Sequence, residues 1–132
     1  MIRLLLTPLT ISIAFWALLG PSSQNKSDLE VQIQRGNSRG VAFLEQLSYE
    51  AAAREFSGLL DRDPDFVPAH VNLGIALFNL QRYEEASQSF ETALGLEPKQ
   101  IQSHYMMGLI YRNQDQAKKA KEAFQQVARQ DP

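Results

Sequence analysis

The sequence repeats itself every 34 residues. Gly40, Gly74 and Gly108 follow this spacing, although a glycine inside a run of good helix formers costs a helix about 1 kcal/mol relative to alanine. Three other columns keep the same spacing: Ala52, Ala86 and Ala120; Phe56, Phe90 and Phe124; Pro64, Pro98 and Pro132. Self-similarity of this period is typical of helical repeat arrays, in which each unit packs mainly against its neighbours.

The pattern predicts helices only. They cover about residues 28–46, 49–62, 67–80, 83–96, 101–113 and 116–129. Ser27 and Glu30 form an S-x-x-E capping box, which indicates a helix start. Short links such as "QR" before Tyr83 favour antiparallel neighbours, and no segment alternates long enough for a strand. The expected fold class is all-α, an antiparallel helix-pair solenoid of three repeats.

Each repeat places its glycine in the first helix and its alanine in the second. We expect Gly74 to lie against Ala86, because two helices approach closely where the facing side chains are small. Phe90 follows Ala86 by one helical turn, so it would fill the gap toward the next repeat. The gain in packing would then offset the poor helix propensity of glycine.

Composition excludes several classes of function. The net charge of about −2 gives no basic field for nucleic acid, and the absence of cysteine removes disulfides, zinc thiolates and thiol nucleophiles. We find no phosphate loop, metal-ligand spacing or nucleophile motif. We therefore expect no enzyme activity, no cofactor and no metal. Lys118, Lys119, Lys121 and Arg129 have Glu122 and glutamines between them, which indicates a solvated helix face.

The N-terminus differs from the rest of the chain. Met1 to Gly20 has one cation, Arg3, followed by an apolar run that begins at Leu4. This pattern is typical of a signal peptide or a short membrane anchor. We expect an exported protein, periplasmic or extracellular, or one anchored by residues 4–20. A polar linker over residues 21–27 would follow, then repeats over residues 28–66, 67–100 and 101–132.

These residues resemble the tetratricopeptide repeat family, whose first helix carries Trp, Leu, Gly and Tyr and whose second carries Ala, Phe, Ala and Pro. The second copy matches at Leu73, Gly74, Ala86, Phe90, Ala93 and Pro98, with His70 and Leu77 at the Trp and Tyr places. The third matches at Met107, Gly108, Tyr111, Ala120, Phe124 and Pro132, with His104 and Val127 at the Trp and second Ala places. The first has Gly36 and Arg39 at apolar positions but keeps Gly40, Phe43, Ala52, Phe56, Leu59 and Pro64.

A weaker similarity concerns "NSRGVAFLEQ" and "PDFVPAHVNLGIALFN". Both segments are similar to repeats that precede FG-GAP/ASPIC-type propeller domains in exported bacterial proteins. Repeat arrays usually end in a polar cap, and we expect a short family member, an oligomer or a piece of a longer protein.

The two histidines occupy the same repeat position. His70 and His104 could share a metal or a proton, or each could fill the place of a large aromatic residue in the helix-pair packing. Since the period already accounts for them, we expect the second.

The family resemblance implies a binding groove lined by the first helices. In the repeat register, the candidate peptide-binding residues are Asn37, Val41, Leu44, Val71, Asn72, Ile75, Phe78, Gln102, Tyr105, Leu109 and Arg112. Phe78, Tyr105 and Arg112 are of the types that anchor interfaces. Alternatively, Val71, Ile75 and Leu109 pack against adjacent repeats.

The carboxylate clamp known in this family is not expected here. Asn72 fits it, but Asn37, Gln102 and Met106 stand where cations are wanted, and Val41 stands where an asparagine is wanted.

The sequence thus favours a protein–protein interaction scaffold that binds a peptide or a partner helix in the groove. The alternative is an accessory repeat segment of a larger exported protein whose C-terminal domain is absent. The expected partner is a protein or peptide, with self-association possible, no nucleic acid, and the membrane reached only through the N-terminal segment.

Overall fold

The structure, a computed structural model, describes residues 22–130; residues 1–21 and 131–132 lie outside the description. The predicted signal or anchor over residues 1–20 therefore falls outside it. In the described part, no helix is both long and apolar enough to cross a membrane. The chain divides into two units, Met1–Gln32 and Ile33–Pro132, and the second contains the repeats.

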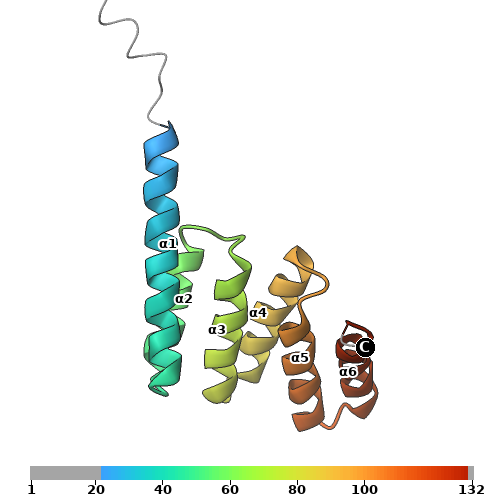
Figure 1. Cartoon of the computed structure of the whole chain (residues 1–132). Helices are drawn as coiled ribbons and strands as arrows, with labels where there is room; N and C mark the ends of the chain where they lie inside the picture. Colours follow the sequence, from blue (N-terminus) through green and yellow to red (C-terminus); the bar gives the residue numbers. More distant parts are fainter. Residues whose placement is uncertain (1–21, 131–132) are drawn as a thin grey trace, which may run out of the picture. The chain divides into compact units, whose positions relative to one another are not determined.

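The described residues form six helices and no strand, as predicted. The helices are α1 (Ser22–Glu45), α2 (Tyr49–Leu60), α3 (Val67–Asn79), α4 (Tyr83–Leu96), α5 (Ile101–Asn113) and α6 (Ala117–Gln130). Within the second unit, α2 to α6 follow one another as packed neighbours, and Figure 1 shows them joined by short turns. The bounds of α4 and α5 match the prediction to the residue.

The expected start of the first helix at Ser27 is wrong. α1 begins at Ser22, so residues 22–27, which composition favoured as a linker, are helical. A capping serine must stand outside the helix, whereas Ser27 lies inside it, and a serine is tolerated there. Pro21 is the sequence signal that we missed, because proline is accommodated at the start of a helix.

The turn between the two helices of a pair has the same geometry in all three repeats. Leu47, Gln81 and Asp115 are left-handed, with φ of 57°, 61° and 57°. At the first turn the Ser48 amide donates to the Phe43 carbonyl oxygen at 2.8 Å, and the Leu47 amide donates to that of Leu44 at 2.9 Å. This is the Schellman arrangement that ends a helix, and it usually employs glycine at the left-handed residue.

The glycines of the first helices lie under phenylalanine rings. A β-carbon on Gly40, Gly74 or Gly108 would come within 2.6, 2.6 and 2.5 Å of the ring of Phe56, Phe90 and Phe124 respectively. The three atoms nearest to such a β-carbon on Gly74 all belong to Phe90, and the contact of Gly74 with Ala86 stays a prediction. The ring of Phe90 occupies the space above Gly74, because a flat ring fits against bare backbone where a side chain would clash.

Phe56 and Phe90 are fully buried and belong to two clusters of the core. Phe56 lies with Leu59, Ala69 and Ala76. Phe90 lies with Met107 and Ile110 of α5, as predicted for a residue that fills the gap toward the next repeat. The second helices α2 and α4 therefore each close their own pair and contact the next one.

The first repeat departs from the family pattern by two compensated exchanges. The positions of His70 and Ala93 are taken in the first repeat by Gly36 and the larger Leu59, whose Cδ2 would lie 2.5 Å from a β-carbon on Gly36. Arg39 takes the position of Leu73 and forms an ion pair with Glu55. The hydrogen bond and charge of Glu55 raise the pKa of Arg39. The weak match of this repeat thus has a structural reason.

Replacing Leu47 with glycine should stabilise the protein by about 1 kcal/mol, because the left-handed conformation strains a residue that has a β-carbon. The Leu47 side chain is 69% exposed, so little packing is lost. Urea unfolding measures the change. Leu47→Ala keeps the β-carbon and should give no comparable gain; an equal gain from both variants would contradict the strain.

Gly74→Ala should destabilise the protein by about 1–3 kcal/mol, because the new methyl group overlaps the ring of Phe90. Helix propensity alone predicts the opposite sign. Gly58→Ala in α2 is the matched control, since nothing lies within 4 Å of its added β-carbon. Thermal and urea unfolding should show the control as stable as, or more stable than, the original chain.

Candidate functional site

The candidate face consists of the predicted residues on α1, α3 and α5; we call it the first-helix face. Its polar members lie together. Asn72 Nδ2 donates to Asn37 Oδ1 at 3.4 Å across two repeats. Val71, Asn72 and Gln102 line a hollow of about 190 Å³. The structure therefore brings amide side chains of all three repeats to this face.

The apolar members of the face are held by the core. Val41 and Leu44 pack against the first cluster, and Ile75 and Phe78 against the second. All four are half-buried, as is Leu109. Val71 is only 3% exposed and is a core residue that reaches the edge of the hollow. For Val71, packing against the adjacent repeat therefore describes the side chain better than an open groove surface.

The three predicted anchors have different surroundings. Phe78 makes an edge-on contact with Tyr83, with ring centroids 5.4 Å apart. Tyr105 is 47% exposed and lies 5.9 Å from the ring of Phe124. Arg112 is exposed and lines a hollow beside Phe124. Tyr105 and Arg112 thus both border Phe124, whereas Phe78 lies in the last turn of α3 against the start of α4.

The two histidines form hydrogen bonds that hold the connections between repeats in place. His70 Nε2 donates to the Pro64 carbonyl oxygen at 2.7 Å, and His104 Nε2 donates to the Pro98 carbonyl oxygen at 2.9 Å. Each ring thus ties its helix to the proline of the preceding connection. Among residues 22–130, no group of His, Asp and Glu is placed to hold a metal ion. The repeated bond gives both rings a structural role.

Two hollows on another side of the repeats were not predicted, and they are equivalent. We call the hollow of about 480 Å³ between α2 and α4 groove 1, and that of about 390 Å³ between α4 and α6 groove 2. Their floors hold the same repeat positions: His70, Leu73 and Leu77 in groove 1, and His104, Met107 and Tyr111 in groove 2. The recurrence of these floor positions was the sequence signal for the grooves. It does not locate them alone, because three separate helices contribute to each groove.

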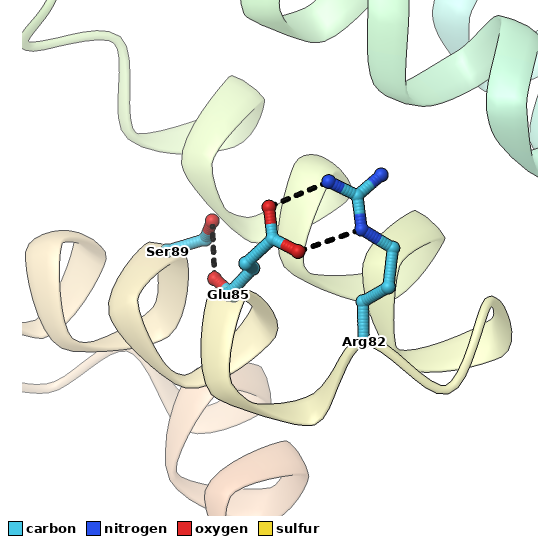
Figure 2. A network of polar contacts seen from close by, with 3 residues as sticks. All are labelled: Arg82, Glu85 and Ser89. Atoms are coloured by element: carbon cyan, nitrogen blue, oxygen red, sulfur yellow. Dashed lines mark hydrogen bonds and ion pairs between the residues drawn. The ribbon is translucent and has the colours of Figure 1, made fainter.

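The walls of the two grooves carry different charges. In groove 1, Arg82 Nε donates to Glu85 Oε1 at 2.7 Å and its Nη2 donates to Oε2, while the Ser89 hydroxyl donates to the Glu85 carbonyl oxygen (Figure 2). The hydrogen bond from Arg82 lowers the pKa of the Glu85 carboxyl. Both partners are exposed, so the pair contributes little to stability.

In groove 2, Lys119 takes the place of Glu85 and lies 5.4 Å from the centre of the Tyr111 ring. Burial raises the pKa of Tyr111, and the charge of Glu91 adds to the effect. The equivalent position is thus acidic in one groove and basic in the other. One ligand would not meet the same charges in both.

Comparison with solved structures shows the same helical architecture. The second tetratricopeptide domain of Spaghetti (RPAP3), bound to the HSP90 peptide SRMEEVD, matches with a TM-score of 0.74 at 21% identity, over 80% of this chain and 96% of that one. A MamA variant matches with a TM-score of 0.70 at 22% identity, over 89% and 91%. The type III secretion translocator chaperone SycD of Yersinia enterocolitica matches with 0.70 at 16%, over 72% of both chains.

No curated protein sequence is significantly similar to the chain. Family models of the tetratricopeptide repeat match residues 37–101 and residues 102–132. Together they match residues 37–132, which include most of the first predicted repeat and all of the second and third. The chain belongs to the tetratricopeptide repeat family.

Proposed function

We propose that the chain is a protein-interaction scaffold that holds a peptide or a partner helix against its first-helix face. The observation that carries this proposal is the set of amide side chains on that face. Asn72 forms a hydrogen bond with Asn37 and lines the same hollow as Gln102. The solved structures of similar fold include one with a bound peptide and one of a secretion chaperone. Both likenesses favour binding of other polypeptides.

The chemistry of the face suits a neutral polypeptide. An amide side chain both donates and accepts, so Asn72 and Gln102 can pair with the amide and carbonyl groups of a bound backbone. Half-buried side chains such as Ile75 and Leu109 offer apolar contacts beside them. Because these groups are held by the repeat packing, little ordering is needed on binding.

The face does not suit an acidic C-terminus such as that of SRMEEVD. Of the eleven candidate residues only Arg112 is a cation, and it borders Phe124 rather than the hollow of Asn72. A carboxylate there would lose water without gaining a charged partner. We therefore propose an uncharged or apolar segment as the ligand, and binding rather than catalysis as the role.

Replacing both Asn72 and Gln102 with alanine should weaken partner binding by about tenfold, because two amides that pair with the ligand backbone are lost. Partners are first captured by in-cell crosslinking with the full chain. Binding of each is then measured by titration. Circular dichroism and urea unfolding establish that the variant is folded.

The matched control replaces Gln88 and Gln126 with alanine. It also removes two amides, but from groove 1 and groove 2. Full affinity in the control, together with loss in the first variant, places binding on the first-helix face. Equal affinity of the original chain and the Asn72/Gln102 variant would refute the proposal, and loss in the control alone would move binding to the grooves.

A further inference from the structure

The outer side of α6 is the third copy of a face that is covered in the first two repeats. In α4, Tyr83, Phe90 and Leu94 pack in one cluster with Met107 and Ile110 of α5. In α2, Ala53, Phe56 and Leu60 pack with Ala69, Ala76 and Leu73 of α3. The equivalent stripe of α6 is Ala117, Lys121, Phe124 and Ala128, which we call the terminal face. Its spacing puts all four on one side of the helix.

Among the described residues, no helix covers the terminal face, and a hollow of about 530 Å³ lies there. α6 stands at the end of the row of helices, next to α5 (Figure 1). Phe124 is half-buried, whereas Phe56 and Phe90 are fully buried. The exposed ring of Tyr105 lies beside it. Two aromatic rings thus remain accessible where the other repeats bury theirs.

The shape of the hollow indicates what could fill it. α4 has Tyr83 and Leu94 where α6 has the much smaller Ala117 and Ala128. The helices that cover the inner repeats bury small residues, such as Ala69 of α3 and Ser103 of α5, beside larger ones, such as Met107 and Ile110 of α5. At the terminal face, two positions of the stripe on this chain are small. A helix that fits there must supply the bulky apolar side chains itself.

The charges near the terminal face indicate which charge a partner should carry. Residues 101–130 contain five cations, Arg112, Lys118, Lys119, Lys121 and Arg129, but only two carboxylates, Asp115 and Glu122. Arg112 and Lys121 both line the hollow, and no carboxylate of residues 22–130 forms an ion pair with either. Glu122 lines groove 2 instead. A partner with acidic side chains would therefore find unpaired positive charge around an apolar hollow.

A second copy of this chain would not fit the terminal face in either of the two simplest packing arrangements. A symmetric contact between two α6 helices would bring Lys121 of one copy near Lys121 of the other. A continuation of the repeat stack would place α1 on α6, and α1 has Arg35 where α3 has the covering residue Ala69. Both arrangements set like charges against each other, which is unfavourable.

We propose that the terminal face binds an acidic amphipathic helix of another protein, one with a stripe of bulky apolar residues flanked by carboxylates. The helix would lie on α6 as α3 lies on α2 and as α5 lies on α4, and its carboxylates would pair with Arg112 and Lys121. This surface is separate from the amide hollow of the proposed function.

The test titrates the full chain with a synthetic helical peptide of about the length of α6 and follows backbone amide shifts by NMR. The peptide has leucines in one stripe and glutamates on both flanks. A matched peptide has lysines in place of the glutamates. We expect shifts at Tyr105, Phe124 and Ala128, and binding about tenfold weaker for the lysine peptide because it repels the two cations.

Variants of the chain locate the contact. Lys121→Glu should weaken binding of the glutamate peptide by about tenfold or more, whereas Lys119→Glu makes the same charge change on the groove 2 side and should have a much smaller effect. The double substitution Ala117→Tyr and Ala128→Leu introduces the residues that α4 has at the equivalent positions. It should keep the fold, fill the hollow and abolish binding.

Four results would overturn the proposal: equal binding of both peptides, equal effects of the two lysine variants, retained binding after the hollow is filled, or shifts confined to the hollow of Asn72 and Gln102. Sedimentation of the chain alone adds a fifth. A concentration-dependent dimer that Lys121→Glu dissociates would show that a second copy is the occupant.

Discussion

The packing of a phenyl ring against a bare glycine is the contact on which the rest of this structure depends. It occurs at Gly40, Gly74 and Gly108, and in each case a β-carbon would overlap the ring. The contact sets how closely the two helices of a pair approach. Phe90 then meets Met107 and Ile110 of the next pair, so one side chain fixes distances both within and between repeats. Glycine is kept at a cost in helix propensity because no other residue leaves room for the ring.

The repeat register places the candidate binding surfaces as well as the core. The first-helix face combines neighbouring positions of successive first helices, the two grooves have equivalent floor positions, and the terminal face is the third copy of a stripe that α2 and α4 also carry. Their differences lie in a few exchanges, such as Glu85 against Lys119 in the grooves and Leu94 against Ala128 on the stripes of the second helices. A scaffold of this kind can change its ligands by surface exchanges without altering the packing beneath them.

Much of the fold could be predicted from the sequence, because the same 34-residue pattern occurs in three copies. The bounds of α4 and α5 were predicted to the residue, since prolines and short links mark them. The start of α1 was not, because a capping box is a local pattern that also occurs inside helices. The position of the Phe90 ring over Gly74 was also not predicted. The columns show that glycine, alanine and phenylalanine recur together, but the rotamer that lays the ring over glycine depends on the packed helices.

The candidate site was predictable only in part. The register brought Asn72 and Gln102 to one face, and the structure places them around one hollow. Val71 shares this register yet is buried in the second core cluster, which also contains residues of α5. A repeated column in the sequence does not show which neighbouring side chains cover a residue. The grooves were missed for a related reason. Each needs three helices, and only the floor positions repeat clearly enough to be noticed.

A double-mutant cycle between Gly74→Ala and Phe90→Leu tests the central contact most directly. The free energy of unfolding is measured for the original chain, both single variants and the double variant. If the ring excludes a β-carbon, the cost of Gly74→Ala should fall by about half or more once Phe90 is leucine, giving a coupling of about 1 kcal/mol. Additive effects of the two substitutions would contradict the account, because they would mean that the glycine and the ring act independently.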